Sequence, residues 1–262
     1  MKSFFRRVTH AYNNLRLQTK LTITHLVIVT IPMAAIMLIF FTRIYDMIVS
    51  DTIRNEQEAA LQTAPLIESE VSDILSAHDQ LTEHAFYQKL IYSARTESLK
   101  ELSVSEEAED FQREIHKLTA GGLIGDIRIY LDVPGNESIF SEGFIHSAAE
   151  PLDRAYRTYW YGIFAGQPAK SELFCPAFYL STYEAQNYGD IAYISKNRTI
   201  YNGDWVTVYL AIYFSTDHLR DTLADNLSSN SSVAYIINER ESIVATTDLA
   251  LSGTYHFSYD VV

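Results

Sequence analysis

The chain has 262 residues, of which 47% are hydrophobic and 13% aromatic, which excludes an intrinsically disordered protein because there is enough apolar surface to offset backbone entropy. Its 33 acidic and 20 basic residues give a net charge of −13, which argues against nucleic acid as a partner bound through bulk electrostatics. The single cysteine, Cys175, excludes an intrachain disulfide and a cysteine-rich zinc site.

An apolar segment lies close to the N-terminus. Residues 21–41 contain no Asp, Glu, Lys or Arg, and a helix of this length crosses a hydrocarbon core of about 30 Å. The segment is longer than a typical signal-peptide core, and no small-x-small cleavage site follows it. A buried helix of a globular protein rarely keeps both faces apolar over this length. The sequence therefore predicts a transmembrane helix at residues 21–41.

The flanking charges predict the orientation of this helix. Residues 1–20 hold five basic residues and no acidic one, whereas Arg43 is the single basic residue that closely follows the span. The positive-inside rule then makes residues 1–20 a cytoplasmic tip and places residues 42–262 outside the cytoplasm, in a cell membrane protein. Residues 51–262 hold the remaining 14 basic and 32 acidic residues, a net charge of −18.

A seven-residue repeat beyond the span predicts a long stalk helix over residues 42–86. The seam consists of Ile53, Ala60, Ile67, Ile74 and Leu81, with Ala64, Val71, His78 and Ala85 at the interleaved positions. Pro65 is a potential kink. Two interpretations remain open, because the seam can pair two copies of the chain or pack on the chain's own domain.

Helix and strand patterns alternate after the stalk. A capping box at Ser103 and Glu106 predicts the start of an amphipathic helix that ends at Gly121-Gly122. Alternating apolar residues then predict a strand at 126–131, followed by a turn at 133–136 and a second strand at 138–141. We interpret these two strands as a hairpin.

A second group of elements contains a strand that is apolar on both faces. A helix is predicted at 151–165, and strands are predicted at 173–179, 191–201 and 205–214. Asn202-Gly203 joins the last two strands in a tight hairpin. Both faces of residues 205–214 are apolar, which is typical of a central strand with helices on one side and a pocket on the other.

The C-terminal part of the sequence predicts the start of another domain. Ser215 caps a linking helix at 215–227, and a polar linker at 228–232 follows. A hairpin of strands at 233–237 and 242–246 comes next. Only 16 residues follow this hairpin, so we expect the chain to end within a second, incomplete domain.

This order of elements resembles the double Cache sensor region of bacterial membrane receptors, and most closely the extracytoplasmic input region of two-component sensor histidine kinases. The resemblance rests on the Trp160-Tyr161 pair, on WVTVYLAIYFSTDHLRDTL at 205–223 and on YIINERESIVAT at 235–246, and it covers roughly residues 15–250. It implies an α+β fold in which a transmembrane helix and a stalk helix lead into a PAS-like (Cache) antiparallel sheet module, followed by the start of a second module.

The resemblance divides the chain into five parts. These are the cytoplasmic tip at 1–20, the transmembrane helix at 21–41, the stalk at 42–86, a distal Cache sensor module at 87–227 and the start of a membrane-proximal Cache module at 228–262. It further implies a homodimer that addresses a response regulator through a cytoplasmic part. A chemoreceptor or cyclase input region is the alternative with the same fold.

Catalytic motifs are missing from the sequence. We find no nucleophile elbow, HExxH site, P-loop or dinucleotide fingerprint, and no phosphoacceptor helix, nucleotide lid or second apolar span. We therefore expect no catalytic residue, cofactor or metal in these residues, and expect any kinase activity to belong to the parent protein.

An aromatic cluster with two charges forms the candidate ligand site. The expected site residues are Arg157, Trp160, Tyr161, Tyr179, Asp190 and Tyr193. Arg can clamp a carboxylate, Asp can pair with an ammonium group, and aromatic rings supply apolar walls. In amino-acid-binding Cache domains a Tyr, an Arg, a Trp-Tyr pair and a later Asp form the pocket; here Arg157 lies three residues before Trp160. The expected ligand is a small polar metabolite, an amino acid, amine or carboxylate; the alternative is that these aromatics are core and the module binds no small molecule.

Overall fold

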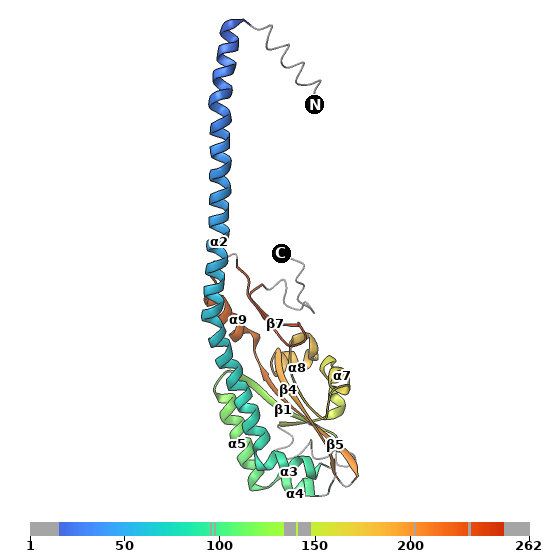
Figure 1. Cartoon of the computed structure of the whole chain (residues 1–262). Coiled ribbons are helices and arrows are strands. Elements are labelled where there is room, and N and C mark those ends of the chain that lie inside the picture. Colours follow the sequence, from blue (N-terminus) through green and yellow to red (C-terminus); the bar gives the residue numbers. More distant parts are fainter. Residues whose placement is uncertain are drawn as a thin grey trace. The chain divides into compact units, whose positions relative to one another are not determined.

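The computed structural model describes residues 16–94, 96, 98–133, 140, 148–201, 203–229 and 232–248. The chain divides into two compact units, Met1–Glu58 and Ala59–Val262. Helix α2 (Leu17–Glu83) contributes to both units and is the long blue helix of Figure 1. Each unit is described by itself.

The first unit is the N-terminal part of α2. The predicted span at 21–41 is helical throughout, and Pro32 does not interrupt it. Large apolar side chains along it, including Ile36, Leu38 and Phe40, are more than 60% exposed. Such a continuous uncovered surface is costly in water and favourable in lipid. By length and composition α2 is thus a candidate membrane span, and the described part of the chain buries none of its apolar stretch.

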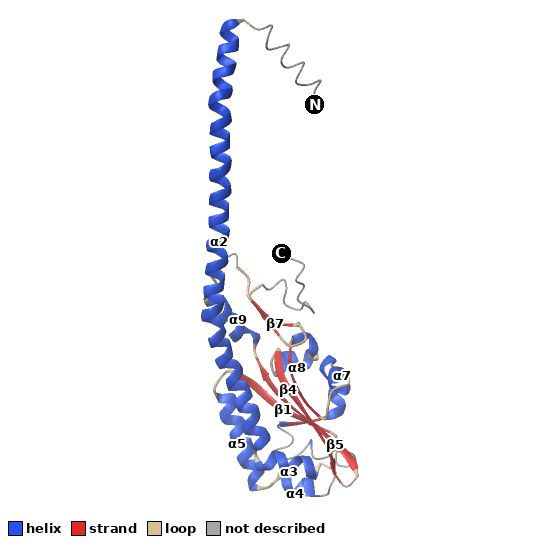
Figure 2. Ribbon diagram, in the orientation of Figure 1, coloured by secondary structure: helices blue, strands red, loops and turns tan. Residues whose placement is uncertain are grey.

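The second unit is built around a five-stranded mixed sheet, shown in red in Figure 2. Its strands, in the spatial order β2-β1-β5-β4-β3, are β1 (Ile124–Leu131), β2 (Ala149–Pro151), β3 (Lys170–Cys175), β4 (Ile191–Tyr201) and β5 (Asp204–Phe214). The fold is α+β, and β5 lies at the centre of the sheet, as its two apolar faces predict.

One strand pair departs from the expected antiparallel sheet. Strands β1 and β2 pair in parallel, whereas β1 with β5, β5 with β4 and β4 with β3 pair antiparallel. The chain between β1 and β2 has the dozen or more residues that a parallel connection requires. Of the predicted strand at 138–141 only Phe140 is described, and it is not in a strand; most of the predicted turn at 133–136 lies outside the described residues.

Three predicted element boundaries are wrong for local reasons. The helix at 151–165 is divided into η2 (Leu152–Ala155) and α7 (Tyr159–Ala165), because the Thr158 side chain caps α7. The strand at 173–179 stops at Cys175, since Pro176 has no N–H for the ladder, and η3 (Ala177–Tyr179) follows. The capping residue of α5 (Glu106–Ala120) is Ser105, whose Oγ accepts from the Ala108 N–H, and Ser103 instead ends α4 (Ser98–Ser103).

The two faces of the sheet carry separate hydrophobic cores. On the first, which we call the stalk face, Val208, Leu210 and Ile212 pack with residues of α2, α3 (Ala85–Ser93), α5 and α9 (Thr216–Asp225). On the second, the pocket face, Tyr209 and Tyr213 pack with residues of η2, α7, η3 and the segment around α8 (Thr182–Asn187). In Figure 1, α2 and α5 lie on the side of the sheet away from α7 and α8.

The stalk seam is divided between the two interpretations. Ile74, His78 and Leu81 are buried in the second unit, so this half of the seam packs on the chain's own domain. Ile53 and Ala60 remain exposed in the single chain. Helix α2 ends at Glu83 and α3 begins at Ala85, within the predicted stalk at 42–86. A dimer through the exposed half stays a prediction.

The elements after β5 follow the sequence pattern. Ser215 caps α9, its Oγ accepting from the Asp217 N–H at 3.1 Å. Thr222 of α9 donates to Glu70 of α2 at 2.8 Å, which joins the linking helix to the stalk helix. Strands β6 (Tyr235–Ile237) and β7 (Ile243–Thr246) form the predicted antiparallel hairpin as a separate two-stranded sheet.

Gly189 gives a test of the packing between α8 and β5. Its φ is +154°, and a Cβ there would lie 2.7 Å from the backbone oxygen and 2.8 Å from the backbone nitrogen of Phe214. We expect Gly189→Ala to lower the free energy of unfolding by about 1–3 kcal/mol in urea denaturation. Gly162→Ala, where nothing lies within 4 Å of the new Cβ, is the matched control and should raise it by roughly 0.4–1 kcal/mol. Equal stability of the two variants would contradict this packing.

Candidate functional site

A cavity of about 470 Å³ opens on the pocket face, between β1, β2, η2 and α8. We call it the Glu184 cavity. Its lining residues are Tyr130, Glu150, Arg154, Arg157, Ser181, Tyr183, Glu184 and Tyr188. Its volume lies within the range of small-molecule sites, and its lining combines aromatic rings with both signs of charge.

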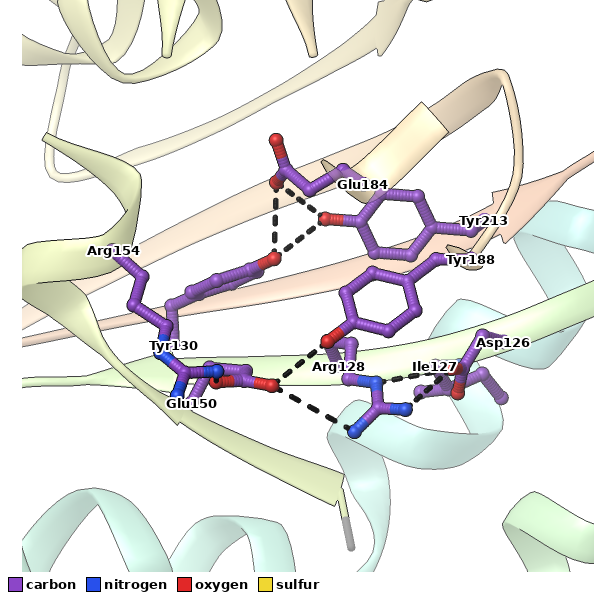
Figure 3. Close-up of polar contacts among 9 residues, drawn as sticks. All are labelled: Asp126, Ile127, Arg128, Tyr130, Glu150, Arg154, Glu184, Tyr188 and Tyr213. Carbon is purple, nitrogen blue, oxygen red and sulfur yellow. Dashed lines mark hydrogen bonds and ion pairs between the residues drawn. The ribbon is translucent and has the colours of Figure 1, made fainter. Parts of the chain in front are cut away.

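Glu184 is the buried polar centre of this site. Its side chain is 4% exposed, and Oε1 accepts hydrogen bonds from the hydroxyls of Tyr130 at 3.0 Å and Tyr213 at 2.7 Å and from Trp160 Nε1 at 3.2 Å. Figure 3 shows the two phenols pointing at the same oxygen. A carboxylate in this environment is tolerated only because these donors replace the water that it loses.

Local sequence explains the position of Glu184. Ser181 and Glu184 form a capping box at the start of α8, in which Ser181 Oγ accepts from the Glu184 N–H and Glu184 Oε2 accepts from the Ser181 N–H. Oε2 thus caps the start of α8, and Oε1 is left to accept hydrogen bonds from the tyrosines of the sheet. Burial raises the pKa of Tyr130 and of Tyr213 well above the ordinary value, so both phenols keep their protons.

A second polar network begins at the lining residues Glu150, Arg154 and Tyr188 and extends to Arg128 and Asp126. Glu150 accepts a hydrogen bond from the Tyr188 hydroxyl at 2.8 Å and pairs with Arg154, while Arg128 Nη1 lies 3.9 Å from Glu150 Oε1. Arg128 also donates to Asp126 at 2.6 Å, and its guanidinium lies 4.2 Å from the centre of the Tyr188 ring. Figure 3 shows Arg154, Glu150, Arg128 and Asp126 arranged in a chain of alternating charge.

The charges at the cavity are not all compensated. Arg128 and Arg154 are matched by Asp126 and Glu150. Arg157 is exposed at the lining and forms no ion pair with any residue that the structure describes. The lining therefore presents one guanidinium that has no ion-pair partner among the described residues, which suits a small molecule with a carboxylate.

The structure brings some of the predicted site residues together. Arg157 lines the Glu184 cavity, and Trp160 lies behind it, fully buried, with its indole N–H on Glu184. Tyr161 is half-buried against the Tyr156 and Tyr209 rings and is not part of the lining. Of the six, Arg157 and Trp160 thus contribute to this site.

The other three do not converge on this cavity, which corrects the prediction of a single pocket. Tyr179 is buried, and its hydroxyl lies 2.8 Å from Ser242 Oγ. Asp190 accepts from the Thr216 N–H at 2.7 Å and fixes the start of α9. Tyr193 faces the stalk side, because the two-residue period of β4 turns it away from the side to which Ala192 and Ile194 point.

Sequence reasoning missed Glu150, Glu184 and Tyr188, which carry most of the polar contacts of the site. The Ser181-x-x-Glu184 spacing is a readable capping box and could have located α8. The long-range partners of Glu184 leave no such local signal. No group of three or more metal-ligating side chains occurs among the described residues, so nothing in this part of the chain points to a metal centre.

Comparison with known proteins gives one structural similarity to report. No family model matches the chain, and no curated protein matches it either. Among solved structures, the chain is similar to the sensory domain of the Campylobacter jejuni chemoreceptor Tlp3 (CcmL), determined with isoleucine bound. The alignment covers 84% of this chain and 78% of that chain, with 14% sequence identity and a TM-score of 0.34.

The buried phenols predict a loss of stability at alkaline pH. Unfolded tyrosine titrates near pH 10, whereas the pKa values of Tyr130 and Tyr213 are raised in the fold. Their stabilisation is therefore complete below pH 10 and is lost as the pH rises above it, by about 1.4 kcal/mol per pH unit for each tyrosine. Urea unfolding at pH 9 to 11 should show this slope, and Tyr213→Phe should reduce it. The exposed Tyr159→Phe is the control, and equal slopes for both variants would contradict the assignment.

Proposed function

We propose that the chain is the membrane-anchored, extracytoplasmic ligand-sensing input region of a sensor histidine kinase in two-component signal transduction. The observation that carries the proposal is the Glu184 cavity, lined by an Arg157 that has no ion-pair partner among the described residues, on one face of a sheet whose other face packs on α2. The candidate span in α2 and the basic residues at 1–20 support an anchored protein with its N-terminus in the cytoplasm.

The lining of the cavity favours a small polar metabolite, such as an amino acid, an amine or a carboxylate. Arg157 offers a guanidinium group to an anionic end, and Glu150, whose partner Arg154 is exposed, is the lining carboxylate nearest in kind to what a cationic end requires. The rings of Tyr183 and Tyr188 supply apolar walls and π-faces. No cofactor is required for this recognition.

A contact path supports transmission from the cavity to the stalk. Glu184 is hydrogen-bonded to Tyr213 near the end of β5, and the chain enters α9 directly after Phe214. Thr222 of α9 is in turn bound to Glu70 of α2. A ligand that prefers one arrangement of Glu184 can therefore bias α9 and the stalk helix, and a homodimer would carry this bias to a response regulator through a cytoplasmic part.

Two alternatives share the same fold. A chemoreceptor or cyclase input region would have the same cavity and the same anchor but a different cytoplasmic output. A membrane-anchored interaction module would bind no small molecule, and the available guanidinium of Arg157 in a cavity of this size favours ligand binding over that reading.

The first test of the proposal is topological. A reporter enzyme that is active only after export, fused after residue 60, should be active, because residues 1–20 carry the basic charge that stays inside. The same reporter fused after residue 16 is the control and should be inactive. Activity of a cytoplasm-restricted reporter at residue 60 would contradict the orientation.

The second test is ligand binding by the full chain in detergent micelles. A screen of amino acids, amines and carboxylates should yield a compound that raises the melting temperature, since ligand at 100 times its Kd adds about 2.7 kcal/mol of stability. Arg157→Ala should abolish this shift without lowering the melting temperature of the free protein, because Arg157 is exposed.

A matched control for this experiment is Arg198→Ala, which removes an exposed arginine that stacks on Trp205, away from the cavity lining. Its ligand shift should equal that of the unaltered chain. Loss of the shift in both variants, or in neither, would contradict binding in the Glu184 cavity.

A further inference from the structure

A second cavity, of about 430 Å³, lies on the stalk side of the sheet. We call it the stalk-face cavity. Val71 and Leu75 of α2, Leu219 of α9 and Phe174 of the edge strand β3 line it, and the β6–β7 hairpin closes one side. Its wall is predominantly apolar, and it shares no lining residue with the Glu184 cavity.

The polar groups of this cavity are of one sign. The Asn238 side chain is engaged by the protein itself, since its Nδ2 donates to the Phe174 carbonyl at 2.9 Å and its Oδ1 accepts from the Ser242 N–H at 3.0 Å. The remaining polar lining consists of Glu172, Glu239 and the Tyr193 hydroxyl, and among the described residues no lysine, arginine or histidine lines the cavity. Neither glutamate forms an ion pair with any residue that the structure describes.

The electrostatic influence of these carboxylates is felt at the Tyr193 hydroxyl. The Tyr193 hydroxyl donates to Glu172, and burial, together with that hydrogen bond and the charges of Asp79 and Glu239, raises the pKa of Tyr193. The Tyr193 hydroxyl is thus hydrogen-bonded to one glutamate of the cavity lining, and Glu239 belongs to the same lining. The Phe174 and Tyr193 rings lie 4.7 Å apart at the same place and add π-faces to the negative potential.

We propose that the stalk-face cavity binds an organic cation with an apolar body. The apolar part occupies the space between Val71, Leu75 and Leu219, and the cationic nitrogen lies at Glu172 and Glu239. An anion or a zwitterion would place a carboxylate against these glutamates with no basic lining side chain to receive it. A neutral compound would gain the apolar contacts but not the attraction of the two exposed carboxylates.

The position of this site goes beyond the proposed sensing function. The ligand would touch α2, α9 and the β6–β7 hairpin at once, whereas the Glu184 cavity touches none of them. An occupant of the stalk-face cavity would therefore act on the stalk helix directly, as a second input.

Three probes of similar size and different charge test the proposal on the full chain in micelles. These are 2-phenylethylammonium, 2-phenylethanol and 3-phenylpropanoate, with binding measured by equilibrium dialysis. Leu75→Trp, whose larger side chain fills the cavity, gives the background from partition into detergent, and Leu75 is exposed enough to accept the change. We expect the cation to bind at least tenfold more tightly than the alcohol or the acid, and to lose this binding in Leu75→Trp.

Charge-removing variants identify the anchor groups. Glu172→Gln and Glu239→Gln should each weaken the cation several-fold while leaving the alcohol unchanged, and 0.5 M salt should weaken the cation alone. Arg157→Ala, in the Glu184 cavity, should leave the binding of all three probes unchanged. A negative result for the stalk-face cavity is therefore distinguishable from a negative result for ligand binding in the Glu184 cavity. Equal binding of the three probes, retention of cation binding in Leu75→Trp, or no effect of either glutamine variant would overturn the proposal.

Discussion

The second unit depends on the burial of the Glu184 carboxylate. A buried charge without an ion pair destabilises a fold by several kcal/mol unless hydrogen-bond donors surround it. Here the donors come from β1, β5 and α7, and the carboxylate itself belongs to α8. Four elements far apart in the sequence must therefore meet at one point, so this requirement selects one arrangement of the pocket face in a way that apolar packing alone would not.

A buried cation plays the corresponding role at the other end of α7. Lys196 of β4 is 5% exposed, and its ammonium donates to the carbonyls of Phe164 at 2.7 Å and Gln167 at 3.1 Å. Burial lowers its pKa, yet the carbonyls at the helix end offer the partial negative charge that a cation prefers. The pocket face thus combines its hydrophobic core with oriented polar contacts, whereas the stalk face is held mainly by aliphatic and aromatic packing.

The parts of the fold that could be predicted are those that local pattern determines. The residue pattern predicted strand β4 and the two apolar faces of β5, and Ser215 predicted the start of α9. The site could not be predicted in the same way, because the Tyr130–Glu184 contact joins residues 54 positions apart in the sequence. Tyr193 shares the aromatic type of the pocket residues, but its alternation with Ala192 and Ile194 in β4 places it on the opposite face.

Two consecutive residues at the end of β5 are connected to the two cavities. Tyr213 is hydrogen-bonded to Glu184 on the pocket face, and the next residue, Phe214, lines the stalk-face cavity. Successive side chains of a strand point to opposite faces, so a shift of this one peptide moves both. Ser215 follows at once and caps α9. Two ligands that favour the same position of Tyr213 and Phe214 must then strengthen each other's binding, and two that favour opposite positions must weaken it, by the same factor in both directions.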